Sequence, residues 1–371
     1  MAMPKILQIC HGQIIPEYIS AYSLRCHNLL KNYENRLLVS AGGPVLVDKN
    51  MGNSRQYRSV LIMIMSYLKG NRAFEVFLSM GKYLRKKYVH EVIKEIKKSD
   101  IIIFEGPWQY QLFRPYLKDK FIIYDAHNYE TGLRSGNPYE NYVSKIEQEL
   151  LKNAHMILSL SVNDIMEFKK IIDESKIFYI PLLTENKNIE WNGMETNNIV
   201  FIGSLYQANI DAVRHILEMS AKLPEFNFII IGNVKNYKFK ESQKNVKFLG
   251  VIDDAKKDMV LRSACMAVNP VMEGSGRNLK VLDYLSYGIP VVSTKIGLRS
   301  YEEYNTDNNI IIGDIQEFPE KIRYLCKNRE LLRIQSFKSL EMYKKIIKSE
   351  GNINPAKIIL NEYKKLNHDI N

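Results

Sequence analysis

The sequence predicts an α/β protein with two domains, each built on a parallel sheet with helices on its faces. Three observations support this fold class. Short apolar runs alternate with amphipathic helical patterns, as in parallel sheets covered by helices. The alternation stops in a polar stretch rich in Asn and Glu, and it restarts at Ile199. The chain has 371 residues, more than one hydrophobic core usually holds.

The first half contains five short apolar runs that predict buried strands, at 6–10, 36–40, 101–105, 121–125 and 156–159. Between them, apolar residues recur at helical spacing and predict helices at 21–31, 59–68, 73–97, 142–152 and 164–172. We therefore expect a first domain at 1–182. A linker is expected at 183–198, where periodicity is weak.

The second half repeats the pattern. It predicts strands from Ile199 and at 228–231, 246–249, 265–268, 291–293 and 310–312. Helices are expected from 319 to 326 and onward to 366. These elements predict a second domain at 199–345, with a terminal helical segment at 346–371.

Composition limits the class of protein. The four cysteines show neither paired nor metal-like spacing, which favours buried thiols in a reducing compartment. The N-terminus has no signal-peptide core, and no apolar run reaches the ~18 residues of a membrane span. We therefore expect a cytoplasmic protein. We also expect no metal and no cofactor, because no cluster of metal-ligating residues is visible.

The segment at 269–294 carries the strongest chemical signal and reads NPVMEGSGRNLKVLDYLSYGIPVVST. A strand ends before Gly274, Ser275 and Gly276, where small side chains let the backbone approach a ligand. Arg277 and Lys280 follow on one face of the next helix, beside its unpaired N–H groups. Such a corner suits a phosphate or diphosphate. The alternative is a small-residue turn that serves only strand-to-helix packing.

This segment closely resembles the donor-binding motif of retaining GT-B glycosyltransferases, especially the subgroup with Gly-Ser-Gly-x-Asn-Leu-Lys, which includes Asn278. Three further segments are similar to the same family in the same order: FIIYDAHNYE from Phe121, IVFIGSLYQANIDAVRHIL from Ile199 and NVKFLGVIDD from Asn245. The resemblance implies a GT-B fold, with two Rossmann-like domains whose parallel sheets face each other across a cleft. It also implies that the terminal helix returns to the first domain.

The resemblance implies roles for individual residues. His127 would bind a hydroxyl of the transferred sugar, although a histidine at a strand end is often only structural. Glu273 would contact the donor sugar, and Asp283 would hold the ribose. Gly203 and Ser204 would lie against the diphosphate, with a plain turn as the alternative for Ser204.

Two departures from the family pattern stand out. Val281 occupies the usual spacing of the second glutamate, so the ribose role falls to Asp283. Ser204 and Asn209 stand where many relatives have an arginine and a lysine, so Arg277 and Lys280 must supply the positive charge.

The family implies retaining transfer of a sugar from a nucleotide diphosphate sugar to a glycan or lipid-linked glycan acceptor, without a metal. The expected setting is cell-surface polysaccharide or glycoconjugate synthesis. A nucleotide-sugar epimerase of the same fold is one alternative. The net charge of +11 also admits a nucleic-acid-binding protein. However, the sequence offers no nucleic-acid module, and we expect no nucleic-acid partner.

Positive charge gathers at 54–100, where eleven Lys or Arg oppose four Asp or Glu, a net +7. These residues are interleaved with apolar ones, so the segment could lie against an anionic membrane surface. We therefore expect peripheral attachment to the inner face of the cell membrane. The alternative is helices that bury one face and solvate a basic one.

Overall fold

The computed structural model describes residues 3–14, 21–42, 48–69, 74–182, 191–240, 242–274 and 276–368. The chain divides into two compact units. Unit 1 comprises Met1–Leu182 and Ile353–Asn371, and unit 2 comprises Leu183–Asn352. Most of the expected linker, 183–190, lies outside the described residues.

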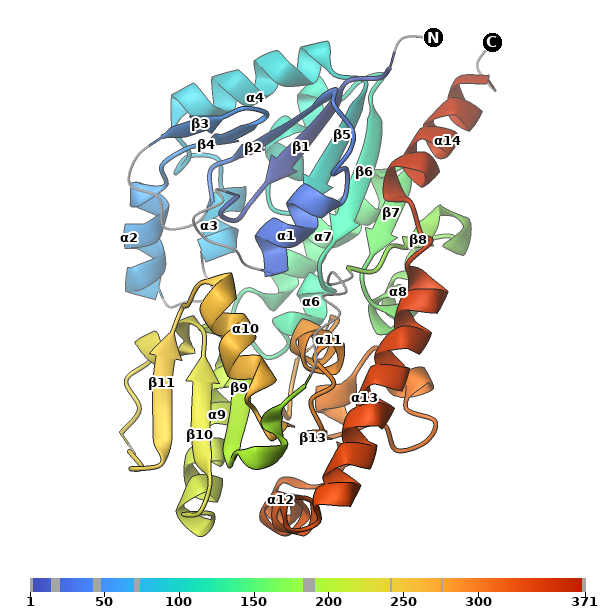
Figure 1. The fold of residues 1–371 in the computed structure, drawn as a ribbon. Coiled ribbons are helices and arrows are strands. Elements are labelled where there is room, and N and C mark those ends of the chain that lie inside the picture. Colours follow the sequence, from blue (N-terminus) through green and yellow to red (C-terminus); the bar gives the residue numbers. More distant parts are fainter. Residues whose placement is uncertain are drawn as a thin grey trace. The chain divides into compact units, whose positions relative to one another are not determined.

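Unit 1 is built on an eight-stranded sheet with the order β3-β4-β2-β1-β5-β6-β7-β8 (Figure 1). Its strands are β1 Ile6–Cys10, β2 Arg36–Ser40, β3 Lys49–Met51, β4 Ser54–Gln56, β5 Ile101–Glu105, β6 Phe121–Ala126, β7 Met156–Ser159 and β8 Ile177–Tyr179. Neighbouring strands are parallel except for the short β3–β4 hairpin. The five predicted strands are confirmed. Sequence reading missed β3, β4 and β8, which are only three residues long and show no apolar alternation.

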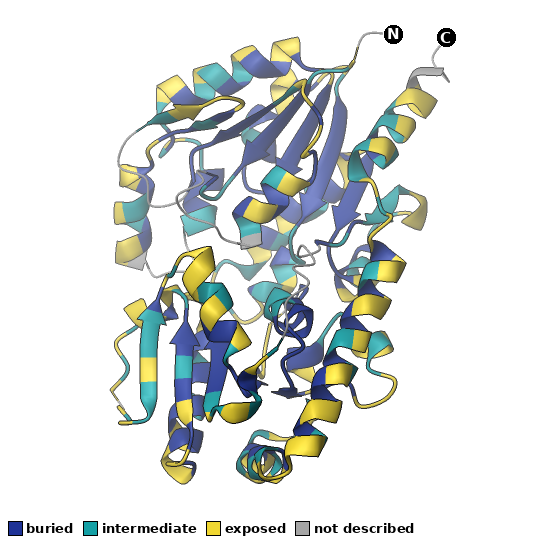
Figure 2. Ribbon diagram, viewed as in Figure 1, coloured by how far each residue is buried: buried dark blue, intermediate teal, exposed yellow. Residues whose placement is uncertain are grey.

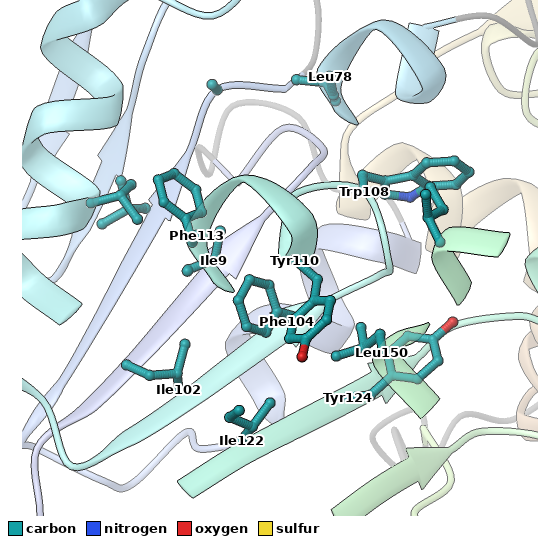
Figure 3. Packing of buried hydrophobic residues seen from close by; sticks show 14 of the residues in the cluster. Ile9, Leu78, Ile102, Phe104, Trp108, Tyr110, Phe113, Ile122, Tyr124 and Leu150 are labelled. Atoms are coloured by element: carbon teal, nitrogen blue, oxygen red, sulfur yellow. The ribbon is translucent and has the colours of Figure 1, made fainter. Parts of the chain in front are cut away.

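Both faces of this sheet are buried, because alternate residues of its central strands enter different hydrophobic clusters. Ile102 and Phe104 of β5 pack with Trp108, Tyr110 and other apolar residues of one cluster (Figure 3). Ile101 and Ile103 pack into the cluster on the other face. The near-continuous apolar strands of the sequence therefore reflect burial on both sides.

The helices of unit 1 are α1 Ala21–Asn28, α2 Val60–Lys69, α3 Phe74–Ser79, α4 Lys86–Lys98, α5 Tyr110–Phe113, α6 Glu130–Leu133, α7 Glu140–Asn153, α8 Val162–Phe168 and α14 Pro355–His368. The predicted helix at 73–97 is wrong as a single element. Two helices replace it, and Gly81 lies between them with φ +41°. A left-handed residue interrupts the helical backbone there.

The terminal helix α14 packs within unit 1. Ile359 is fully buried in the cluster that contains Ile6 and Ile101. The ring of Tyr363 lies 5.6 Å from that of Phe121, edge to face. Apolar contacts therefore attach the end of the chain to the sheet that its beginning forms.

Unit 2 has a six-stranded sheet of parallel neighbours, in the order β11-β10-β9-β12-β13-β14. Its strands are β9 Asn198–Ile202, β10 Asn227–Ile231, β11 Val246–Gly250, β12 Met266–Asn269, β13 Val291–Ser293 and β14 Ile311–Ile312. All of them were expected from the sequence, to within one or two residues at their ends.

The helices of unit 2 are α9 Gln207–Lys222, α10 Asp254–Arg262, α11 Leu279–Ser286, α12 Phe318–Lys327 and α13 Arg329–Glu350. One face of the sheet packs with α9 and α12, and the other packs with α11 and α13. The strands are mostly buried, whereas the helices expose their outer faces (Figure 2). None of the described helices is long and apolar enough to span a bilayer.

Candidate functional site

Three loops of unit 2 follow neighbouring strands and carry most of the residues that the sequence singled out. Because β9, β12 and β13 are adjacent and parallel, their carboxyl ends meet at one edge of the sheet. Gly203 and Ser204 follow β9, residues 270–278 follow β12, and Arg299 comes after β13. In open parallel sheets, ligands bind at this edge.

The turns after β9 and β10 approach each other closely. The Gly203 amide donates to the Ile231 carbonyl at 2.9 Å. A Cβ atom at Gly232, where φ is +107°, would lie 2.2 Å from the Gly203 carbonyl oxygen. Gly232 therefore has no room for a side chain. Ser204 is exposed next to this turn, and its contact with a diphosphate stays a prediction.

The loop after β12 needs its two glycines, because Gly274 has φ +123° and Gly276 has φ +72°. Arg299 lies along this loop. Its Nε donates to the Gly276 carbonyl at 3.1 Å, and its Nη2 would lie 3.1 Å from a Cβ atom at Gly274. Ser275 lies outside the described residues. A cation from the segment after the neighbouring strand β13 therefore flanks the glycine loop.

Asn278 holds the start of α11 in place. Its side chain is buried, and Nδ2 donates to the Gly297 carbonyl at 2.7 Å. Asn269 donates to the same carbonyl at 2.8 Å. The Asn278 amide is therefore used inside the protein, and its contact with a ligand stays a prediction.

Lys280 is a partly buried cation. Its Nζ donates to Asn209 Oδ1 at 2.6 Å and lies 4.4 Å from the centre of the Phe201 ring. Asn209 in turn donates to the Ser204 carbonyl at 3.0 Å. Burial and the nearby charge of Arg299 lower the pKa of Lys280 to about 7. No carboxylate pairs with this amine in the described part of the chain.

Arg277 has a different environment from the one that the sequence suggested. Its side chain has no exposed area, and its Nη2 lies 2.8 Å from Glu350 Oε2. Its Nη1 donates to the other Glu350 oxygen at 3.1 Å, and its Nε donates to Tyr301 at 3.0 Å. Glu350 already balances the charge of Arg277. These contacts attach the loop to the end of α13. They argue against direct binding of a diphosphate by Arg277, and that role is untested and stays a prediction.

The two predicted acids of unit 2 lie on opposite sides of the glycine loop in the sequence. Glu273 is exposed just before Gly274. Asp283 Oδ2 accepts from Lys257 Nζ of α10 at 2.8 Å, and the Asp283 side chain remains 21% exposed. Both carboxylates are accessible to solvent. Their contacts with the sugar and the ribose stay predictions.

His127 of unit 1 lies directly after β6, within a buried polar network. Its Nε2 donates to Glu105 Oε2 at 2.8 Å and lies 3.8 Å from Asp125 Oδ2. The Tyr22 ring stacks on the imidazole, with 4.7 Å between ring centres. Arg25 pairs with both oxygens of Asp125, at 2.9 and 2.7 Å. Each buried charge thus has an opposite charge beside it.

This network determines the charge of His127. Burial alone would lower the pKa of His127, but hydrogen bonds to Cys26 and Glu105 and the charge of Asp125 outweigh it. The pKa rises to about 10, so the imidazole is protonated at neutral pH. A protonated imidazole is a hydrogen-bond donor at both nitrogens.

The loop after His127 is fixed by Glu147 of α7. Its carboxylate accepts from the backbone amides of Glu130 and Thr131, at 2.9 and 2.8 Å. It also accepts from the hydroxyl of Tyr124 at 2.9 Å. Burial raises the pKa of Glu147 to about 7 despite the hydrogen bond from Thr131. Glu147 therefore positions this loop without belonging to it.

One group of side chains has the composition of a metal site. Ligand atoms of Cys26, Glu105 and His127 lie within 4.8 Å of one another. Sequence spacing did not reveal this cluster, because its members come from three separate elements. A metal there would have to displace the proton that His127 donates to Glu105. The expectation of no metal and no cofactor stays a prediction.

Sequence reading missed Arg299 and Glu105 as partners of the predicted residues. Arg299 had a usable signal, since it is a cation shortly after a strand at the ligand-binding edge. The ion pair between Glu105 and His127 was not predicted, although both residues were expected at the carboxyl ends of strands in the first domain.

Comparisons with known proteins bear on the same regions. Residues 196–328 match the family model for group 1 glycosyl transferases. An uncharacterised 44.6 kDa protein from the cps region of Klebsiella pneumoniae is 27% identical over 145 residues. That alignment covers 35% of this chain and 37% of the Klebsiella protein, so only about a third of either chain is compared.

Solved structures resemble the chain over nearly its whole length. Anabaena Alr3699/HepE in complex with UDP-glucose has a TM-score of 0.68 at 11% identity, covering 99% of this chain and 100% of that one. Sucrose-phosphate synthase from Thermosynechococcus elongatus has a TM-score of 0.70 at 11% identity, with coverages of 99% and 100%. WaaG, a glycosyltransferase involved in lipopolysaccharide biosynthesis, has a TM-score of 0.64 at 12% identity, with coverages of 91% and 95%. These likenesses establish the GT-B fold that the sequence predicted.

Proposed function

Because residues 196–328 match the group 1 glycosyltransferase family, we propose that this protein is a retaining glycosyltransferase. It moves a sugar from a nucleotide diphosphate sugar to a glycan or lipid-linked glycan acceptor. The product belongs to a cell-surface polysaccharide or glycoconjugate. The donor site lies at the carboxyl edge of the unit 2 sheet.

The unbalanced positive charge of Lys280 is the observation that carries this proposal. Its amine faces Asn209 rather than a carboxylate, and burial, together with the charge of Arg299, lowers its pKa. Burying the Lys280 amine near a second cation costs free energy, which a bound anion would recover. A diphosphate beside the glycine loop supplies that negative charge.

The same arrangement suits the chemistry of sugar transfer. When the bond between the sugar and the diphosphate breaks, negative charge builds up on the departing diphosphate. Lys280 and Arg299 stabilise that charge, and removing one such donor should cost about 3 kcal/mol of activation free energy. His127, protonated at neutral pH, donates a hydrogen bond to a hydroxyl of the transferred sugar.

The related structures suggest where to begin with substrates. Alr3699/HepE is in complex with UDP-glucose, so UDP sugars are the first donors to test. The Klebsiella relative comes from a cps region, and WaaG is involved in lipopolysaccharide biosynthesis. Both likenesses support a role in surface glycans. We also propose that the protein works at the inner face of the membrane, where a lipid-linked acceptor would lie.

A donor screen and product analysis test the proposal. Thermal unfolding is measured with a panel of nucleotide diphosphate sugars, since a donor at 100 times its Kd adds about 2.7 kcal/mol of stability. Lys280→Met should lose this stabilisation, whereas Lys344→Met, an exposed lysine on α13, should keep it. The stabilising donor is then supplied in labelled form with crude glycan and lipid acceptors.

The products separate the proposed activity from its alternatives. A new glycoside with the anomeric configuration of the donor supports retaining transfer. An isomer of the donor would instead indicate an epimerase. Absence of stabilisation by every donor, together with salt-sensitive binding to DNA or RNA, would refute the proposal in favour of a nucleic-acid-binding protein.

A further inference from the structure

Helix α2 of unit 1 exposes an apolar face to solvent. Five large apolar side chains are at least 39% exposed, and Tyr67 reaches 87%. They are Val60 at 39%, Leu61 at 50%, Ile64 at 52%, Tyr67 at 87% and Leu68 at 68%. Figure 2 shows the exposed stretches of this helix in yellow. The spacing i, i+1, i+4, i+7 and i+8 puts them on one side of a helix; we call this the α2 face.

The opposite side of α2 attaches the helix to the core. Ile62 is 1% exposed and Met65 packs against the same hydrophobic cluster. An ordinary surface helix buries its apolar side and solvates charged residues. However, no charged residue occurs between Val60 and Leu68. The α2 face therefore leaves apolar area in water without polar compensation, which is typical of a binding surface.

Three exposed cations close to α2 in the sequence lack carboxylate partners among the described residues. Arg58 precedes the helix and is exposed, and Lys82 and Lys86 are exposed beyond α3. In the described residues, none of these three forms an ion pair. By contrast, Arg85 and Lys87 both pair with Asp48, at 2.6 and 3.3 Å. The positive charge available to an anionic partner is therefore smaller than the sequence suggested. Near α2 in the sequence, Arg58, Lys82 and Lys86 carry it.

We propose that α2 lies in the interface of an anionic membrane, with Leu61, Ile64, Tyr67 and Leu68 inserted among the lipids. Ten residues of helix extend only about 15 Å, too short to cross a bilayer but long enough to lie in its surface. Tyrosine suits this depth, because its ring is apolar and its hydroxyl remains hydrated. Arg58, Lys82 and Lys86 face the lipid head groups.

The small size of the α2 face favours a membrane over a second copy of the chain. The α2 face belongs to one helix about 15 Å long, whereas a stable dimer buries about 800 Å² of accessible surface per partner. Lipid insertion has no such minimum area, because anionic head groups add attraction for each nearby cation. Attachment through the α2 face does not depend on the chemistry of the donor site.

Co-sedimentation with vesicles tests the inference. The full chain is mixed with vesicles of phosphatidylcholine alone or with about a third phosphatidylglycerol, and binding should be stronger to the anionic vesicles. Ile64→Ser/Leu68→Ser should weaken that binding at least about tenfold, because two inserted side chains are lost. The matched control Met259→Ser/Phe337→Ser changes two apolar residues of unit 2 that are 63% and 62% exposed, and it should bind like the wild type.

Two further variants separate lipid insertion from simple charge attraction. Tyr67→Trp places a fluorophore on the α2 face, and its emission should shift to shorter wavelength with anionic vesicles. Arg58→Gln/Lys86→Gln should also weaken binding to the anionic vesicles, because it removes two exposed cations that form no ion pair with the described residues. Thermal unfolding of each variant confirms that it is folded.

Three results would overturn the inference. The first is equal vesicle binding by the wild type and Ile64→Ser/Leu68→Ser. The second is an unchanged tryptophan emission when anionic vesicles are added to the Tyr67→Trp variant. The third is light scattering that shows a dimeric wild type and a monomeric Ile64→Ser/Leu68→Ser protein, which would assign the α2 face to self-association. None of these results affects donor stabilisation, so the proposed activity is tested separately.

Discussion

Lys280 offers a direct test of the anion site, because its charge changes near neutral pH. Burial, together with Arg299, lowers its pKa from an ordinary value of 10.5 to about 7. A diphosphate beside the amine favours the ammonium form and raises the pKa again. Donor binding at pH 7 should therefore be accompanied by partial proton uptake. Lys280→Met removes the titrating group while keeping a side chain of similar length.

The size of the pH effect on donor affinity follows from the pKa of Lys280 in the free protein. Because the pKa is higher in the complex, donor binding is strongest below pH 7 and weakens as the pH rises through the free value. The ammonium fraction of the free protein is about nine tenths at pH 6 and about one tenth at pH 8. The affinity should therefore fall about tenfold between these two pH values, or about 1.4 kcal/mol.

Isothermal titration calorimetry in two buffers of different ionisation enthalpy measures the proton uptake. The ligand should be a nucleotide diphosphate sugar, because a terminal phosphate would itself titrate near pH 6. We expect about half a proton at pH 7 for the wild type and for Lys344→Met, and none for Lys280→Met. Zero uptake by the wild type, with constant affinity from pH 6 to pH 8, would refute the role of Lys280.

Three further predictions concern the buried polar groups. Arg277→Met leaves the Glu350 carboxylate buried without its partner, so the free energy of unfolding measured with urea should fall by about 3–5 kcal/mol; an unchanged value would show that the pair is not formed. Glu105→Gln should move the pKa of His127 down from about 10, as followed by NMR titration of the imidazole. The raised pKa of His127 stabilises the folded protein fully below about pH 6.5, and this stabilisation is lost as the pH rises to about 10. The free energy of unfolding of Glu105→Gln should therefore depend less on pH over this window. Glu147→Gln replaces one accepting oxygen by a donor, which should cost about 1–3 kcal/mol of stability and lower kcat more than donor affinity; equal kcat values would remove Glu147 from the set of positioning residues.

Local sequence signals were sufficient for the strands that build the two sheets. Runs such as those of β1 and β5 are buried at every position, because both faces of a parallel sheet are covered. Short edge strands such as β3 lack this signal, because their side chains are partly or fully exposed to solvent. The break at Gly81 was also missed, because the apolar spacing of α3 and α4 resembles one continuous helix.

The glycine loop could be read from the sequence because its requirement is local. Gly274 and Gly276 adopt positive φ angles that other residues rarely tolerate, and the cations follow within one helical turn. The direction of each side chain was not readable in this way. The spacing of Arg277 and Lys280 placed them on one helix face, but spacing carries no information on Glu350, which is 73 positions further along the chain.

The sequence by itself determined where most of the strands, the glycine loop and His127 lie along the chain, because apolar runs and backbone conformation are properties of neighbouring residues. Only the tertiary structure decided which cations keep an uncompensated charge. Glu350 neutralises Arg277, whereas Lys280 faces an amide and Arg299. Electrostatic interactions depend on distance in space, and folding brings together partners that the sequence separates.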